Sequence, residues 1–102
     1  MLLAEISMWP MDKGESVGVH VAKVLDVIDR SGLPCKLGPL GTCIEGECDE
    51  VMDLLKQCFD VLCADSNRIA CTVKMDWRKG RSGMIEHKVK SVEQKLGRTL
   101  RK

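Results

Sequence analysis

The sequence predicts an α+β domain in which helices cover one face of a four-stranded antiparallel sheet. Three observations support this prediction. Two segments alternate with the period of two that is typical of half-buried strands, and three others carry apolar residues at helical spacing. Glycine and proline separate these segments at short intervals. The order of the segments along the chain then determines the topology.

The first half of the chain is predicted to hold a strand, a helix and a hairpin. Residues 2–9 alternate as a strand, and residues 17–31 carry apolar side chains on one helical face. We expect Ser16 or a neighbour to cap this helix and Gly32 to end it. Two short strands follow within residues 35–45, because glycine and proline mark a turn between them.

The second half is predicted to hold two more helices around a strand. Residues 49–64 form a helix whose apolar residues spread over more than half of its circumference, so another helix or subunit should cover its flank. Residues 68–77 alternate as a strand whose apolar half faces the core. A last amphipathic helix ends before Gly97, and the tail after it is expected to be frayed. Its apolar stripe consists of Ile85, Val89, Val92 and Leu96.

The resulting order is strand, helix, strand, strand, helix, strand, which is the split β-α-β arrangement of the ferredoxin-like fold, with one additional C-terminal helix. We predict a single domain over residues 1–97 and a basic tail over residues 98–102. Two helices would cover one face of the sheet and leave the other bare, and a bare face pairs with a partner or binds something. The polar half of the alternating strands is placed there: Glu5, Ser7, Thr72, Lys74 and Asp76, with Glu45 beside them.

Composition favours a soluble globular protein. Hydrophobic residues make up 44% of the 102 residues and charged residues 30%, as is usual for such domains. No run of about 18 apolar residues is present to span a membrane, and the first residues do not resemble a signal peptide. We therefore expect a cytoplasmic protein without a membrane partner.

The six cysteines are expected to be free thiols. No two form a C-x-x-C pair, and six in 102 residues is below the roughly 8–10% of small disulfide scaffolds. Most fall at positions that the patterns place in the interior, where a thiol acts as a small apolar group. His20 and His87 are far apart in the sequence, so neither a metal site nor a cofactor site is predicted.

Charge is distributed unevenly along the chain. Up to Val73 there are 6 basic and 12 acidic residues, whereas 10 basic and 3 acidic residues follow from Lys74 onward. Such an imbalance can mark a nucleic-acid surface, a solvated helix or a self-association surface. RNA-binding sheets stack bases on aromatic side chains, but this chain has no tyrosine and a single phenylalanine. Nucleic acid is therefore an unlikely partner on these grounds.

Several segments together resemble a known family. They are "ISMWP", "GPLGTCIEGE", "DEVMDLLKQC", "TVKMDWRKG" and "IEHKVKSVEQKLG". In this order they resemble the small thiamine-binding proteins that were once catalogued as a family of unknown function, over about residues 2–97. The resemblance implies a ferredoxin-like fold, a homo-oligomer that is usually a tetramer, and non-catalytic binding of thiamine or its hydroxymethylpyrimidine part near a subunit interface. The sequence departs from the family at Trp77, where relatives often carry a charged residue.

The polar residues of the predicted bare face have the chemistry that such a ligand requires. Glu45 or Asp76 could accept hydrogen bonds from an aminopyrimidine or offset a thiazolium charge. Ser7 and Thr42 can donate and accept, although Thr42 alternates with Cys43 and could face the helices. The remaining candidates are Trp9, which could stack on a ring, and Thr72 and Lys74, which complete the patch.

Simpler roles for these residues remain open. Glu45 and Lys74 could form a cross-strand ion pair, and Gly38, Gly41 and Gly46 could serve positive backbone φ angles in turns. The open sheet face could also be an assembly or nucleic-acid surface without a small ligand. Cys43 beside Glu45 could suggest a nucleophile, but no histidine is placed near it, so we do not expect an enzyme.

Overall fold

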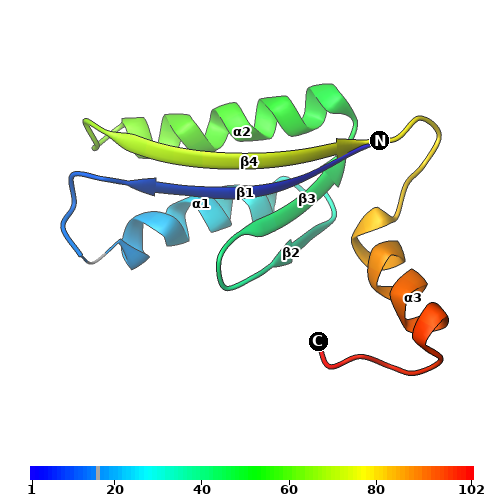
Figure 1. Cartoon of the computed structure of the whole chain (residues 1–102). Coiled ribbons are helices and arrows are strands. Elements are labelled where there is room, and N and C mark those ends of the chain that lie inside the picture. The colour runs from blue at the N-terminus through cyan, green and yellow to red at the C-terminus, as the bar shows by residue number, and fades with distance from the viewer. Residues whose placement is uncertain (16) are drawn as a thin grey trace.

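The computed structural model describes residues 1–15 and 17–102 and contains four strands and three helices in the predicted order (Figure 1). Ser16, the expected helix cap, lies outside the described residues. The elements are β1 (Leu2–Pro10), α1 (Gly18–Arg30), β2 (Cys35–Leu37), β3 (Thr42–Gly46), α2 (Cys48–Cys63), β4 (Ile69–Trp77) and α3 (Met84–Leu96).

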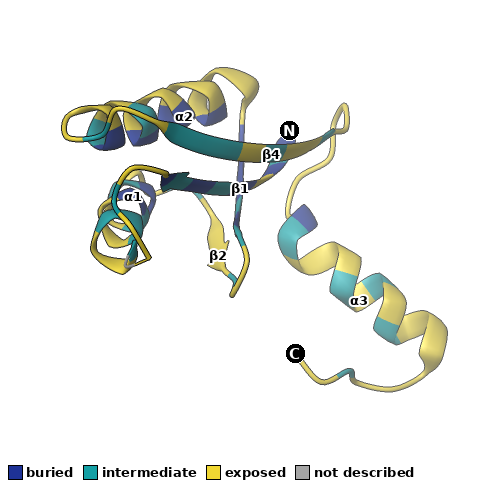
Figure 2. Ribbon diagram, turned by 60° about the vertical axis from the view of Figure 1, so that its left-hand side comes forward, coloured by how far each residue is buried: buried dark blue, intermediate teal, exposed yellow. Residues whose placement is uncertain are grey.

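The strands form one sheet in the order β2-β3-β1-β4, and all neighbours are antiparallel. Each helix between strands connects two strands that are separated by a third, so the predicted ferredoxin-like topology is confirmed. Helices α1 and α2 lie on the same face of the sheet, with α2 towards β4 and α1 towards β2 and β3 (Figures 1 and 2). No helix in the described ranges is long and apolar enough to cross a membrane.

The core lies between the sheet and helices α1 and α2. Even-numbered residues of β1 face these helices, and the strand alternates between buried and more exposed positions as its sequence predicts. Helix α2 begins with a capping interaction, because the Glu50 carboxylate accepts a hydrogen bond from the Glu47 N–H at 2.9 Å. Gly32 follows α1 with a φ of 76°, which confirms its role at the end of the helix. The most completely buried side chains include Ile28, Ile44, Val51, Leu54, Cys58 and Leu62.

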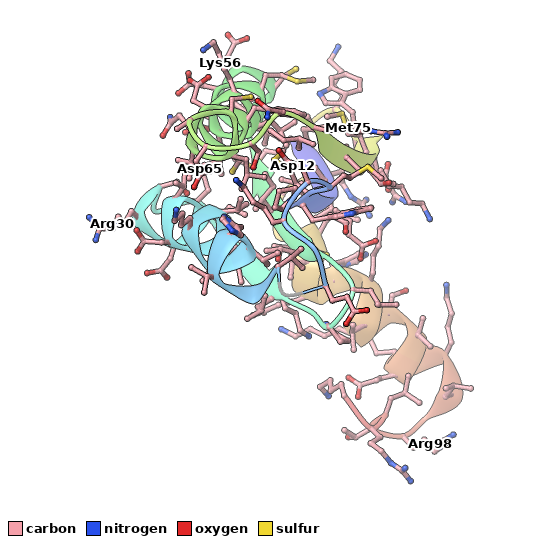
Figure 3. All side chains as sticks on the ribbon, turned by 90° about the vertical axis from the view of Figure 1, so that its left-hand side faces the viewer. Asp12, Arg30, Lys56, Asp65, Met75 and Arg98 are labelled. Carbon is pink, nitrogen blue, oxygen red and sulfur yellow. The ribbon has the colours of Figure 1, made fainter. Side chains whose placement is uncertain are left out.

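Helix α3 packs differently from the other two helices. It stands on the opposite side of the sheet, where its first turn lies against β3 and Lys88 in its second turn reaches Asp76 of β4, and its remainder projects outward (Figure 2). The prediction of an entirely bare face was therefore wrong, because the start of α3 covers part of it. Met84 is buried, whereas Val92 and Leu96, at the outer end of the predicted stripe, are exposed. Arg98, labelled in Figure 3, marks the end of the helix that lies away from the sheet.

Several local predictions need correction. The tail folds back onto α3, because the Glu93 carboxylate accepts hydrogen bonds from the Leu100 N–H and the Lys102 ammonium. Met75 and Trp77 are exposed although they lie on the helix side of β4, which is an edge strand; their register partners on β1, Ala4 and Leu2, are buried. The prediction for α2 needs no such correction: α1 packs against its flank, and Met52, which remains exposed, shows that the sheet and α1 leave part of the apolar arc uncovered.

The cysteines are also less buried than expected. All six are free thiols, but only Cys58 is buried, and burial raises the pKa of its thiol to about 11. Cys43 and Cys71 are half-buried. The other three, Cys35, Cys48 and Cys63, are exposed, so the prediction that most of the cysteines lie in the interior was wrong.

Two glycines of the hairpin segment, Gly38 and Gly41, serve close approach rather than unusual backbone angles. Gly38, Gly41 and Gly46 all lack a positive φ, which contradicts the expected turn geometry. A Cβ atom at Gly38 would lie 2.8 Å from the Gly41 carbonyl oxygen, and one at Gly41 would lie 3.1 Å from the Glu5 side chain. These positions lack room for a larger residue.

Candidate functional site

The register of the sheet brings polar residues of β1 and β4 together on the face opposite α1 and α2, which we call the open face. Glu5 lies opposite Lys74, and Ser7 lies opposite Thr72. Asp76 lies opposite Leu3, on the same face. This confirms the predicted placement of these polar residues, because an antiparallel register of this parity puts odd-numbered β1 residues beside even-numbered β4 residues.

A cavity of about 390 Å³ opens on this face beneath the start of α3. Its size falls in the range of small-molecule sites, roughly 300–1,000 Å³. Strands β1, β3 and β4 provide its floor, and α3 contributes one lysine to its wall. The lining residues are Leu3, Ala4, Glu5, Cys43, Lys74, Met75, Asp76 and Lys88.

Asp76 is the anchor of an ion-pair cluster at the edge of this cavity. Its carboxylate accepts a hydrogen bond from Lys88 Nζ at 2.7 Å and lies 3.7 Å from Arg78 Nε. The hydrogen bond from Lys88, together with the charges of Lys88 and Arg78, lowers the pKa of Asp76. Asp76 is therefore an anion whose charge is largely offset by two cations.

The electrostatic surroundings of Glu5 differ from those of Asp76. Among the residues that the structure describes, no cation lies within 4.0 Å of its carboxylate. Within the described residues, the hydrogen-bond donor to its carboxylate is the Cys43 thiol, with Sγ 4.0 Å from Oε2. Burial and the negative charge of Glu5 raise the pKa of Cys43, so the thiol stays protonated at neutral pH. This arrangement provides a free hydrogen-bond acceptor beside a neutral thiol, not an activated nucleophile.

Glu45 points to the open face as predicted, but its carboxylate is already engaged. It is 3% exposed, and both of its oxygens accept the Met84 N–H, at 3.1 and 3.0 Å. The structure contains no Glu45–Lys74 ion pair within 4.0 Å in its described part, so that alternative was wrong. Glu45 borders another cavity, of about 420 Å³, beside the start of α3.

Thr42 lies on the other side of the sheet, facing the helices. It is 6% exposed and lines a smaller cavity, of about 200 Å³, between α1 and the β2–β3 hairpin. Ser7 also borders this cavity. The structure therefore divides the predicted site: Lys74 and Asp76 belong to the open-face cavity, and Thr42 belongs to the hairpin cavity.

The remaining candidates, Thr72 and Trp9, lie on the open face but outside the cavity. Thr72 is exposed, and Trp9 is half-buried opposite Ala70 at the far end of β1. Neither Glu5 nor Lys88 is among the ligand candidates that the sequence predicts, although strand parity predicts Glu5 on this face. Glu5 could have been found from strand parity alone, whereas Lys88 could not, because its position depends on how α3 docks.

The comparisons with known proteins agree with this architecture. The model of a family described as "Thiamine-binding protein" matches residues 4–93. A UPF0045 protein of Methanocaldococcus jannaschii is 32% identical over 91 residues, which cover 89% of this chain and 91% of the relative. A UPF0045 protein of Mycobacterium tuberculosis is 34% identical over 96 residues, which cover 93% and 94% of the two chains.

Solved structures support the fold independently. A hypothetical protein of Methanocaldococcus jannaschii superposes with a TM-score of 0.83 at 31% identity, over 91% of this chain and 96% of that one. A Thermotoga maritima protein, described as a candidate thiamine biosynthesis/salvage protein, gives a TM-score of 0.79 at 24% identity, over 89% and 97%. The second likeness bears on the fold alone. By the match over residues 4–93, this chain belongs to the thiamine-binding protein family.

Proposed function

We propose that the protein binds thiamine or its hydroxymethylpyrimidine moiety in the open-face cavity, without catalysing a reaction on it, at an interface between copies of the chain. Family membership supports a thiamine-related role. The observation that carries the proposal is the cavity of about 390 Å³ in which Glu5 has no cationic partner within the described chain. Glu5 is solvent-exposed in the single chain, and an unpaired carboxylate of this kind can accept from an aminopyrimidine or offset the charge of a thiazolium ring.

The polar groups of the cavity suit the two halves of the ligand. Glu5 would accept a hydrogen bond from the exocyclic amine, and its charge would offset that of the thiazolium ring. Lys74 and Lys88 can donate to ring nitrogens or to a hydroxyl or phosphate group. Asp76 would act by holding Lys88 at the cavity wall, at 2.7 Å. Ser7, Thr72 and Trp9 would extend the polar surface along the strands.

Self-association into a dimer or tetramer would complete the site. The cavity is open to solvent on the side away from the sheet, and ligand sites usually enclose most of their ligand. A second copy packed on the open face would supply the missing wall. The same packing would cover the exposed apolar residues at the outer part of α3, Val92 and Leu96.

The direct test is isothermal titration calorimetry with thiamine, thiamine diphosphate and hydroxymethylpyrimidine. We expect saturable binding of at least one of the three. Glu5→Gln should weaken it about tenfold or more, since a charge-assisted hydrogen bond contributes about 1.5–3 kcal/mol. Glu15→Gln, which changes an exposed carboxylate away from the cavity, is the matched control and should bind like the wild type.

A further variant, Thr42→Val, distinguishes the two cavities. If it abolishes binding while Glu5→Gln leaves binding unchanged, the ligand occupies the hairpin cavity instead. If none of the three compounds produces heat, the proposed function fails, and the open face is then best explained as an assembly surface.

A further inference from the structure

The basic segment between β4 and α3 has no part in the open-face cavity. It consists of residues 78–83, and it holds three of the ten basic residues that follow from Lys74 onward. One of the three, Arg78, lies 3.7 Å from the Asp76 carboxylate. Among the residues that the structure describes, no carboxylate oxygen lies within 4.0 Å of the side-chain nitrogens of Lys79 or Arg81. These two cations are therefore available to an anion from outside the chain.

The main chain of this segment is anchored to the residue that precedes β1. The Met1 nitrogen donates to the carbonyl oxygens of Arg78 and Arg81, at 2.9 and 3.1 Å. The Arg78 N–H donates in return to the Met1 carbonyl, at 3.2 Å. Gly80 has a φ of 70°, which favours glycine, and it separates Lys79 from Arg81. Figure 1 shows the segment leaving β4 beside the N-terminus. The two cations therefore extend from a loop whose main chain is held in place.

A cavity of about 380 Å³ lies against this loop, and we call it the loop cavity. Its volume falls in the range of small-molecule sites, roughly 300–1,000 Å³. In the described chain it has no lining residue in common with the open-face cavity. Its lining includes Trp77, Lys79, Gly80, Arg81 and Ser82, together with Glu47, which precedes α2.

The side chains of the loop cavity combine an aromatic surface with groups that bind phosphate. The Trp77 side chain is 61% exposed, and an indole face can stack on a planar ring. A lysine ammonium and an arginine guanidinium both form charge-assisted hydrogen bonds to phosphate oxygens. The Ser82 hydroxyl can add a further donor. Glu47 is the carboxylate among the lining residues and opposes an anion, but Lys79 and Arg81 outweigh it, so the lining side chains are net positive.

We propose that the loop cavity is a second binding site, which takes an aromatic phosphate ester, that is, a planar heteroaromatic ring joined to one or more phosphate groups. The ring stacks on Trp77, and the phosphate groups lie between Lys79 and Arg81. Nucleotides have this chemistry, and thiamine diphosphate has it too. Proteins that bind single-stranded nucleic acid stack successive bases on several aromatic side chains, whereas this cavity offers one, so its chemistry favours a small molecule.

The first test is calorimetry of the full chain with ADP and with pyrophosphate, which has the phosphate groups but no ring. We expect saturable binding of both at low ionic strength, and weaker binding in added salt, which screens charges. Trp77→Ala should weaken ADP binding at least about fivefold, since stacking of one base contributes about 1–3 kcal/mol. The same variant should leave pyrophosphate binding unchanged. A purely structural role of Trp77 would not separate the two probes in this way.

Charge variants test the phosphate half of the site. Arg81→Ala should weaken both probes at least about fivefold, because each loses one charge-assisted hydrogen bond. The matched control is Arg101→Ala, which removes the same charge from an exposed position in the tail and should bind both probes like the wild type. Glu47→Gln should tighten the binding of both probes, because it removes the carboxylate that repels phosphate.

Three outcomes would overturn the inference: no binding of ADP at millimolar concentration, equal effects of Arg81→Ala and Arg101→Ala, or tighter binding of a single-stranded oligonucleotide than of ADP.

Thiamine diphosphate distinguishes the source of the phosphate ester and separates this site from the proposed function. If Arg81→Ala weakens its binding and Glu5→Gln does not, thiamine diphosphate is the ester that the loop cavity takes. If Glu5→Gln alone weakens it while ADP still requires Trp77 and Arg81, the loop cavity takes a nucleotide and the open-face cavity holds the thiamine compound. Binding of ADP without binding of any thiamine compound would refute only the proposed function.

Discussion

The Met84 N–H donates to both carboxylate oxygens of Glu45, at 3.1 and 3.0 Å, although the two residues lie 39 positions apart in the sequence. Met84 is the first residue of α3, and both residues are buried. The first N–H groups of a helix lack partners within the helix, and its N-terminus attracts negative charge. Glu45 therefore fixes the start of α3 on the sheet.

Glu45→Gln should lower the free energy of unfolding by about 1 kcal/mol, because the amide keeps an acceptor but loses the charge at the helix N-terminus. Glu45→Ala should cost more, about 1–3 kcal/mol, because the buried N–H then has no partner. Urea denaturation measures both. Glu86→Gln changes an exposed glutamate in the first turn of the same helix and should cost less than about 0.5 kcal/mol. Equal effects of the three substitutions would show that Glu45 does not hold α3.

If α3 is loosened, Lys88 moves away from the open-face cavity. Glu45→Gln is therefore also expected to weaken binding of a thiamine compound without unfolding the protein. Unchanged affinity in this variant would show that ligand binding does not depend on the docking of α3.

The ion pair between Asp76 and Lys88 predicts a pH dependence of α3 docking. The folded state lowers the pKa of Asp76 below its ordinary value of 3.8, first through the hydrogen bond from Lys88. A group with a lowered pKa stabilises the folded state above its unfolded pKa, and this stabilisation is lost as pH falls through the folded pKa. Docking should therefore stay constant above about pH 5 and weaken below pH 3.8. An NMR titration of the Asp76 carboxyl carbon and the α3 amides checks this.

Lys88→Met provides the control for that titration. Without the ammonium, the pKa of Asp76 should rise towards 3.8, and the α3 amides should lose the matching pH dependence. An Asp76 pKa that is the same in the variant and the wild type would contradict the assignment of the shift to Lys88.

The topology could be predicted from the sequence because strand parity and segment order suffice to define it. Alternation in β1 and β4 placed Glu5, Lys74 and Asp76 on one face, and the register of the sheet confirms this. The same parity indicated that Thr42 could face the helices, as it does. These are local properties, which short-range patterns of apolar residues encode directly.

The position of α3 could not be predicted in this way. An apolar stripe indicates which side of a helix is covered, but not which surface covers it. Here the surface is selected by Glu45, whose carboxylate is predicted from the sequence to bind a ligand but holds the Met84 N–H, and by Asp76, which holds Lys88. Both contacts join residues that are distant in the sequence, so no local pattern reveals them.

A buried leucine and an exposed leucine should differ in how much stability is lost when each is replaced by alanine. Leu62 on α2 is completely buried, whereas Leu96 on α3 is 53% exposed. Leu62→Ala should lower the free energy of unfolding by about 2–5 kcal/mol, since a cavity remains in the core. Leu96→Ala should cost less than about 1 kcal/mol in a monomer. A larger loss at Leu96, measured by urea denaturation at several protein concentrations, would show that a second subunit covers this residue.

Two glycines of the same hairpin segment should respond differently to the addition of one methyl group. A Cβ atom at Gly38 would lie 2.8 Å from the Gly41 carbonyl oxygen, which accepts the Gly38 N–H at 2.9 Å. Both groups are backbone, so neither can move without breaking the turn. At Gly46 the nearest atoms belong to the Leu33 side chain, at 3.4 Å, which is ordinary van der Waals contact.

We therefore expect Gly38→Ala to lower the free energy of unfolding by about 1–3 kcal/mol and Gly46→Ala to change it by less than about 1 kcal/mol. Thermal and urea unfolding of the two variants measure the difference. Because Gly38 borders the cavity that holds Thr42 and Gly46 does not, the pair also tests where the ligand binds. If the open-face cavity is the site, Gly38→Ala protein that is folded at low temperature should still bind a thiamine compound. Loss of binding in this folded variant would instead indicate that the ligand occupies the hairpin cavity.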